Sequence, residues 1–207
     1  MLDLVMFDAD GVLFDSSESN VAYYNEIFRI IGEPPLDPDE ERACIFFAAL
    51  QVFEARAKGD TARVERMREV ARTMDSTPFF RLLRPYPGLR AMLLEFKRQY
   101  RLGLATNRSA TIPAIIDYIG LSGIFDAVAS AKDKVRPKPA PDIVQLCLER
   151  AGVGADRAVY IGDSDTDRIA AEEAGTHFIG VGKRAPHFHQ IEHLGQLPEK
   201  LRELFER

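Results

Sequence analysis

Short apolar runs that stop abruptly at polar or glycine-containing residues restrict the fold of this sequence more than any other feature. There are four such runs, and they comprise Leu4–Phe7, Leu102–Ala105, Ala158–Ile161 and His177–Val181. Uninterrupted apolar runs of this length are typical of strands that are buried on both faces of a parallel sheet. Between them lie amphipathic helical patterns, which comprise Leu89–Tyr100, Ile112–Ile119, Asp142–Ala151 and Asp167–Ala174. Strands that alternate with helices predict a doubly wound, Rossmann-like α/β fold with a parallel sheet.

The stretch from residue 16 to residue 84 interrupts this alternation, because it contains helical patterns and no convincing strand. One apolar helical face is made by Val21, Tyr24, Phe28 and Ile31,. Further along, Asp37 followed by Pro38 has the pattern of an N-cap and a first helical residue,. We therefore expect an α/β catalytic core formed by residues 1–15 and 85–207. A helical cap formed by residues 16–84 is inserted into it after the first strand.

The composition of the chain fits an ordinary folded protein and disfavours several classes of function. Of the 207 residues, 46% are hydrophobic and 29% are charged, and the formal net charge is -5,. No long run of Lys or Arg is present, so neither nucleic acid nor a membrane surface is an expected partner. No segment approaches the roughly 18 apolar residues of a membrane helix, and the opening residues lack a signal-peptide pattern. We expect a cytoplasmic protein and a monomer, although a dimer stays open.

The polar residues that end the expected strands are the first candidates for chemistry. In an open parallel sheet, ligands bind outside the carboxyl ends of the strands, where Asp8, Thr106 and Asp163 should converge. Asp8 and Asp10 share one face of an extended segment, and Gly11 lets the chain turn sharply behind them. Neighbouring carboxylates repel, so this pair needs a cation or a shared proton. Taken alone, the two residues could instead belong to an acidic turn that caps a helix.

Two further segments carry groups that suit phosphate. Thr106 offers a hydroxyl at the end of an expected strand, and the backbone N–H groups from Asn107 onward can bind phosphate oxygens. Such residues also begin ordinary helices, which is the alternative at this point. Lys138 stands between Pro137 and Pro139, which limit the backbone freedom around its ammonium group,.

An acidic loop between an expected strand and an expected helix completes the set. It spans Gly162–Asp167 and contains three carboxylates within five positions. Such a group is costly unless it is solvated or shared with a hard cation, which prefers oxygen ligands. Asp163 is the main candidate for such a cation. Asp167 has helix capping as an alternative role, and Asp165 is expected to be exposed.

In order and context, these four segments resemble the motifs of the haloacid dehalogenase-like (HAD) hydrolase superfamily. The closest resemblance is to its phosphoglycolate phosphatase and β-phosphoglucomutase-like branch, which has a helical cap. The resemblance runs from Asp8 to about Gly182; the motifs at Asp8 and Asp163 are specific, and those at Lys138 and Thr106 are less so. It implies a doubly wound core, a helical cap at residues 16–84, and a Mg²⁺-dependent phosphatase that acts on a small phosphorylated metabolite.

The resemblance also implies a role for each matching residue. Asp8 would attack phosphorus and form an aspartyl-phosphate, and Asp10 would act as general acid and base. Thr106, Asn107 and Lys138 would hold the transferring phosphoryl group.

The same resemblance implies a Mg²⁺ site. Its ligands would be Asp8, Asp163 and the main-chain carbonyl of Asp10, and Asp167 would support the metal through water. Charge explains the need for a cation, since a phosphate dianion about 4 Å from Asp8 is repelled by roughly 8 kcal/mol at an effective dielectric constant of 20. A divalent ion offsets this repulsion and orients the attack.

Three functions are compatible with these residues. Dehalogenases of the family lack an acid at the position of Asp10, whereas an alkoxide leaving group needs protonation, so Asp10 favours phosphoryl chemistry. Hydrolysis of a small phosphomonoester is the preferred hypothesis. A phosphomutase of the β-phosphoglucomutase type shares every core motif and stays open as the alternative. A non-catalytic phosphate-binding protein is disfavoured, because such a protein has little reason to keep Asp10 beside Asp8.

Overall fold

The chain forms two compact units. The computed structural model describes all residues except 46, 48, 109, 183–187 and 206–207. One unit, which we call the core unit, comprises residues 1–14 and 85–207, and the other, the insert unit, comprises residues 15–84. Among the described helices, none combines the length and the apolarity that crossing a membrane requires.

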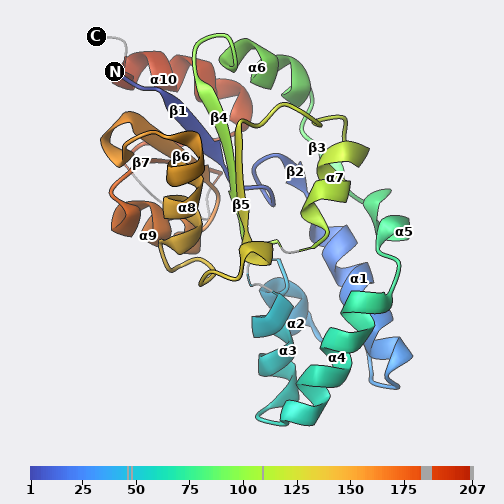
Figure 1. Cartoon of the computed structure of the whole chain (residues 1–207). Coiled ribbons are helices and arrows are strands. Elements are labelled where there is room, and N and C mark those ends of the chain that lie inside the picture. Colours follow the sequence, from blue (N-terminus) through green and yellow to red (C-terminus); the bar gives the residue numbers. More distant parts are fainter. Residues whose placement is uncertain (46, 48, 109, 183–187, 206–207) are drawn as a thin grey trace. The chain divides into compact units, whose positions relative to one another are not determined.

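A six-stranded parallel sheet forms the centre of the core unit (Figure 1), with the strand order β5-β4-β1-β6-β7-β8. Its strands are β1 (Leu4–Phe7), β4 (Arg101–Thr106), β5 (Ala127–Ser130), β6 (Ala158–Gly162), β7 (His177–Val181) and β8 (Gln190–Ile191). The sheet is flanked by helices, which confirms the predicted doubly wound α/β class. All four residues of β1 are fully buried, as expected for a central strand that is covered on both faces,.

The helices of the core unit cover this sheet. They are α6 (Leu89–Phe96), α7 (Ile112–Tyr118), α8 (Asp142–Ala151), α9 (Asp165–Ala174) and α10 (Leu197–Phe205). Helix α8 packs on β4 and β5, α9 packs on β6 and β7, and the two helices also contact each other. Leu4 and Met6 of β1 join the apolar cluster that includes residues of α8 and α9. This packing fixes the carboxyl ends of β1, β4 and β6 next to one another.

The pattern of apolar runs misses strand β5. Its sequence is Ala127 to Ser130, in which two of four residues are alanine, a residue that is depleted in strands,. It forms because it pairs in parallel with β4, from Gly103 opposite Ala127 to Thr106 opposite Ser130. The strand is thus specified by its neighbour more than by its own residues.

The insert unit is helical over most of its length. Its helices are α1 (Ser17–Ile30), α2 (Pro38–Ala43), α3 (Ala49–Ala57), α4 (Thr61–Thr73) and α5 (Thr77–Phe80). The predicted N-cap at Asp37 is confirmed, because its carboxylate accepts from the backbone N–H groups of Asp39 and Glu40. Two short strands, β2 (Phe14–Asp15) and β3 (Arg84–Pro85), pair where the chain passes between the units.

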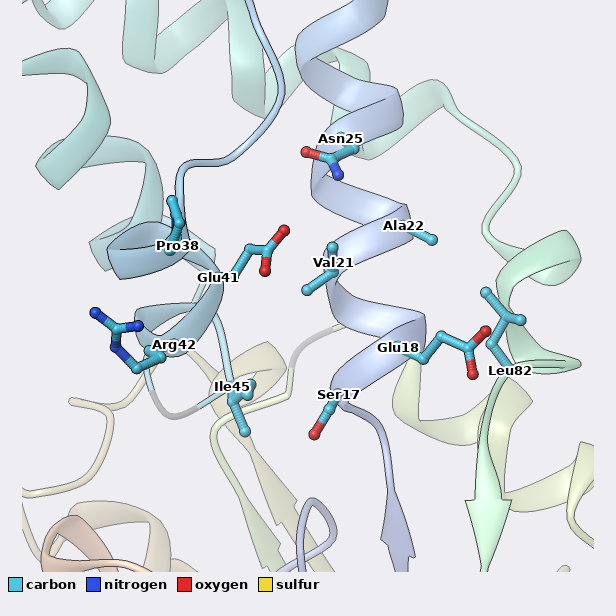
Figure 2. A pocket seen from close by; sticks show the side chains of 10 residues that line it. All are labelled: Ser17, Glu18, Val21, Ala22, Asn25, Pro38, Glu41, Arg42, Ile45 and Leu82. Atoms are coloured by element: carbon cyan, nitrogen blue, oxygen red, sulfur yellow. The ribbon is translucent and has the colours of Figure 1, made fainter.

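A groove lies between α1 and α2 within the insert unit (Figure 2). Its volume is about 590 Å³. Val21, Ile45, Glu41 and Arg42 are among the residues that line it. Figure 2 shows the carboxylate of Glu41 pointing toward α1. The insert unit therefore has a cavity of its own that is large enough for a small molecule.

A buried arginine holds the insert unit together. The side chain of Arg56 is 8% exposed, and it pairs with the carboxylates of Glu33, at 3.1 Å, and Glu40. Its guanidinium carbon lies 4.0 Å from the centre of the Phe28 ring. Arg63 also pairs with Glu33, at 2.8 Å. A charge this well buried stabilises the unit only while its carboxylates are in place.

Replacing this arginine tests the network. Arg56→Met keeps much of the apolar stem but leaves Glu33 and Glu40 without their buried partner, so we expect the free energy of unfolding to fall by on the order of 2 kcal/mol. The matched control is Arg29→Met, which removes an exposed pair with Glu26 and should change stability little. Urea denaturation measures both variants. Equal losses for the two would contradict a special role for Arg56.

Candidate active site

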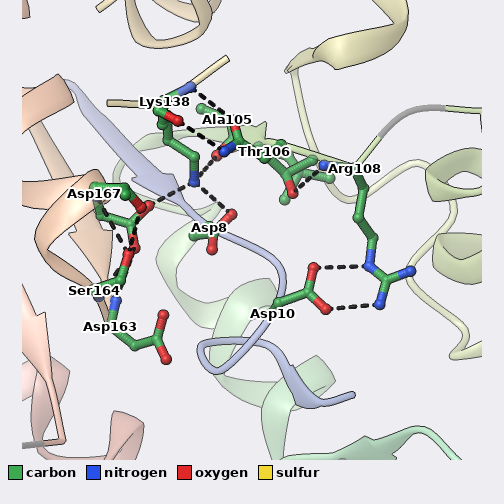
Figure 3. A network of polar contacts seen from close by, with 12 residues as sticks. Asp8, Asp10, Ala105, Thr106, Arg108, Lys138, Asp163, Ser164 and Asp167 are labelled. Carbon is green, nitrogen blue, oxygen red and sulfur yellow. Dashed lines mark hydrogen bonds and ion pairs between the residues drawn. The ribbon is translucent and has the colours of Figure 1, made fainter. Parts of the chain in front are cut away.

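Five of the predicted site residues are brought together at the carboxyl ends of the strands (Figure 3). Asp8 directly follows β1, Thr106 ends β4 and Asp163 directly follows β6. Lys138 comes from the loop before α8, and Asp167 lies in the first turn of α9. All five side chains are buried, with between 1% and 8% of their surface exposed. Polar groups that are this well buried must form hydrogen bonds or ion pairs within the protein.

The ammonium group of Lys138 lies at the centre of this group of side chains. Its Nζ atom is 2.8 Å from Asp8 Oδ1 and 2.5 Å from Asp167 Oδ1. It also donates a hydrogen bond of 2.8 Å to Tyr160 Oη, and this hydroxyl donates one of 2.6 Å to Ala105 O. Burial alone would lower the pKa of Lys138, but Asp167 and Asp8 outweigh it and raise this pKa above its ordinary value.

Asp8 carries the clearest electrostatic cost in the site. Burial raises the pKa of its carboxyl group to about 7; Lys138 opposes the rise, and Asp167 and Asp10 add to it. Although Nζ of Lys138 is 2.8 Å away, Asp8 Oδ1 has no well-directed hydrogen bond from any described residue. The carboxylate form of Asp8 therefore has room for a further positive partner.

Asn107 holds the backbone of the Lys138 loop. Its side-chain Nδ2 donates to Lys138 O over 3.1 Å, and its Oδ1 accepts from Lys138 N over 2.8 Å. The two bonds fix the position from which Lys138 reaches the site. The amide of Asn107 is thus committed to Lys138, and the predicted phosphate contact of Asn107 stays a prediction.

The two carboxylate oxygens of Asp167 have different partners. Oδ1 binds Lys138, whereas Oδ2 accepts from Ser164 Oγ at 2.6 Å and from the backbone N–H groups of Ser164 and Asp163. Ser164 is the N-cap of α9 and forms a capping box with Asp167, so the helix begins at Asp165, two residues before the predicted start. Asp167 therefore both caps α9 and holds Lys138.

Two glycines allow the acidic residues to approach so closely. A Cβ atom on Gly11, whose φ is +73°, would lie 2.0 Å from Asp163 Oδ2. A Cβ atom on Gly162 would lie 2.3 Å from the Cβ of Asp167. No side chain fits at either position unless an acid of the site moves. The need for Gly162 has no signal in the sequence, because it depends on a contact across a turn.

Asp10 is bound by an arginine, Arg108, that lies two residues after the end of β4. Arg108 donates from Nε to Asp10 Oδ2 and from Nη2 to Asp10 Oδ1, both over 2.7 Å. Such a forked pair is stronger and more directional than a single bond. Figure 3 shows the carboxylate of Asp10 turned toward Arg108 rather than toward Lys138. Arg108 follows Thr106 and Asn107 in the sequence, but a pair that spans 98 positions could not be predicted from it.

The cluster of acids fits a hard divalent cation. Asp8, Asp163 and Asp167 each offer one carboxylate oxygen, and these three atoms lie within 4.8 Å of one another. When all three are ionised, Lys138 offsets only one of their charges. Oxygen-only donors with an excess of two negative charges suit Mg²⁺. The under-bonded Oδ1 of Asp8 supports the same conclusion.

Comparisons with known proteins identify the family of this chain. Residues 5–181 match the family described as haloacid dehalogenase-like hydrolase. A phosphoglycolate phosphatase from Caulobacter vibrioides is 31% identical over 186 residues, which cover 83% of this chain and 75% of that protein. The crystal structure of a HAD-superfamily hydrolase, subfamily IA, variant 1, from Geobacter sulfurreducens is 30% identical; it covers 97% of this chain and 96% of its own, with a TM-score of 0.76.

The chain therefore belongs to the haloacid dehalogenase-like hydrolase family, as the sequence predicts. β-Phosphoglucomutase from Clostridium difficile has the same fold, with a TM-score of 0.82 and full coverage of both chains, at 18% identity. Relatives that are named phosphatases, such as the Caulobacter protein, support the predicted enzyme class, a phosphatase hydrolase.

Gly11 gives a direct test of the close approach to Asp163. Gly11→Ala and Gly120→Ala place a Cβ atom at nearly the same φ, +73° and +74°, so both carry a backbone strain of about 1 kcal/mol,. Only the first collides with a site residue, since Gly120 has no described atom within 4 Å of its ideal Cβ. Because Asp163 can rotate away, we expect similar melting temperatures and at least a tenfold lower phosphatase activity for Gly11→Ala alone. Parent-like activity of Gly11→Ala would contradict this account.

Proposed function

We propose that this chain is a Mg²⁺-dependent phosphatase that hydrolyses small phosphomonoesters through a phosphorylated Asp8. The observation that carries the proposal is the position of Asp8. It is buried at the carboxyl end of the central strand β1, 2.8 Å from the Lys138 ammonium group and beside two further carboxylates. A carboxylate that only stabilised the fold would not need an arrangement that raises its own pKa to about 7,.

In the proposed reaction, Asp8 is the nucleophile. One of its oxygens forms a bond to phosphorus while the bond from phosphorus to the leaving oxygen breaks, and Asp10 gives a proton to that oxygen. Water then attacks the phosphorus of the aspartyl-phosphate, Asp10 takes a proton from this water, and Asp8 and inorganic phosphate are released. Lys138 and the hydroxyl of Thr106 hold the phosphoryl oxygens throughout, with the backbone N–H of Asn107 as a further donor.

The acidic residues would hold the metal ion. Asp8 and Asp163 are the proposed direct ligands, together with the main-chain carbonyl of Asp10. Asp167 is proposed to act through water, which agrees with the engagement of its oxygens by Lys138 and Ser164. Bound Mg²⁺ would offset the charge between Asp8 and the phosphoryl group and orient the two.

We assign the role of a cap to the insert unit, which corresponds to the predicted cap of residues 16–84, and the role of catalytic core to residues 1–15 and 85–207. The proposed substrates are small phosphorylated metabolites, because several relatives are named phosphoglycolate phosphatase. A phosphomutase would use the same phosphorylated Asp8 and would differ in returning the phosphoryl group to a sugar hydroxyl. The likeness to β-phosphoglucomutase is one of fold alone, so hydrolysis is the proposal.

A panel of phosphate esters tests this function. We expect the parent protein with Mg²⁺ to release inorganic phosphate from at least one small phosphomonoester, and we expect EDTA to abolish the release. Asp8→Asn removes the nucleophile and should lower the activity by at least about 1,000-fold. The matched control is Asp156→Asn, an exposed acid just before β6, which should stay within twofold of the parent.

Two results would contradict the proposal. One is equal turnover by the parent protein and Asp8→Asn. The other is a parent protein that releases phosphate from no ester of the panel but converts one sugar phosphate into its isomer, which would make the chain a mutase.

A further inference from the structure

Tyr160 contacts Lys138 and has no role in the proposed reaction. It lies in the middle of β6 with no exposed surface. Its hydroxyl donates to Ala105 O over 2.6 Å and accepts from Lys138 Nζ over 2.8 Å. Asp167 Oδ1 lies farther from the hydroxyl, at 3.2 Å. In the sequence, Tyr160 looks like an ordinary core residue, because it is part of an apolar run.

The direction of these hydrogen bonds follows from counting protons. A phenol has one proton, and the short contact to Ala105 O takes it. The lone pairs of the oxygen are then left for an N–H of Lys138. An ammonium group has three N–H donors, and its three nearest acceptors are Asp167, Tyr160 and Asp8. Tyr160 and Asp167 therefore accept two of the three N–H groups, which fixes the rotation of the ammonium group. The third N–H is left on the side of Asp8, without a well-directed bond to its Oδ1.

The hydroxyl, rather than the ring, carries this role. The ring packs against Phe178, with centroids 6.4 Å apart, and phenylalanine would fill the same space. Burying a hydroxyl is costly unless it is hydrogen-bonded, so a position that served packing alone would gain nothing from it. The hydroxyl also links three segments of the site. It donates to Ala105, which precedes Thr106 on β4, and accepts from Lys138, while Tyr160 itself lies three residues before Asp163.

We propose that Tyr160 is a positioning residue for phosphoryl transfer. Its hydroxyl fixes the Lys138 ammonium group in the orientation that meets the phosphoryl oxygens as Asp8 attacks. The proposal rests on the proposed function of the site. Without this hydroxyl the ammonium group keeps its two carboxylates but loses its third anchor. The transition state requires the most precise placement of the ammonium group. Its stabilisation should therefore fall more than the affinity for the substrate.

The test compares Tyr160→Phe with the parent protein on an ester that the parent hydrolyses. We expect kcat to fall about tenfold and KM to stay within twofold. The matched control is Tyr100→Phe, a half-buried tyrosine that packs on Phe96 before the start of β4, and it should keep the parent's kcat. Thermal unfolding of each variant accompanies the kinetics. Unchanged kcat, or a loss that appears only near the melting temperature, would overturn the proposal.

A double-mutant cycle keeps the inference testable if Tyr160→Phe also lowers stability. When Lys138 is replaced by Met, adding Tyr160→Phe should cause no further loss of kcat/KM, because Tyr160 acts through Lys138. An equal loss in both backgrounds would overturn the proposal. An inactive parent protein would overturn the proposed function and this inference together, whereas an active parent with a parent-like Tyr160→Phe would overturn the inference alone.

Discussion

The buried ammonium group of Lys138 is the charge on which the rest of the site depends. With 2% of its surface exposed, it can remain charged only beside Asp8 and Asp167. Leaving either side of such a pair without its partner costs about 3–5 kcal/mol in buried settings. Neighbouring residues hold these charged groups together. Asn107 forms hydrogen bonds to the backbone of the loop that carries Lys138, and Ser164 caps the helix that carries Asp167. The same contacts place a buried positive charge directly beside Asp8.

The sequence predicts the parts of the fold that follow from local patterns. The strand runs at β1, β4, β6 and β7 and the cap of α2 are all present, because continuous burial and N-terminal capping leave signals within a few residues. The meeting of Asp8, Thr106 and Asp163 at one edge is also predictable, since parallel strands that lie side by side end at the same edge. Lys138 is harder to predict, because its local signal is the pair of prolines that flank it.

The remaining parts depend on contacts between residues far apart in the sequence. Strand β5 forms through its pairing with β4, and the pair of Arg108 with Asp10 spans 98 positions. Tyr160 has no signal in the sequence, because it lies within an apolar run. The side-chain amide of Asn107 binds the backbone of Lys138, which the sequence does not indicate. In each case the residue type allows several partners, and tertiary packing selects one. Chemistry at strand ends is thus easier to predict from sequence than the groups that hold it in place.

In the proposed reaction, Asp8 accepts the phosphoryl group from the substrate. The most direct test is to mix the protein and Mg²⁺ with a substrate that is labelled on phosphorus, quench in acid within one turnover, and map the labelled peptide. We expect label on the N-terminal peptide, at Asp8 and not at Asp10. Label on any other residue, or complete hydrolysis without labelled protein at the shortest times, would contradict it.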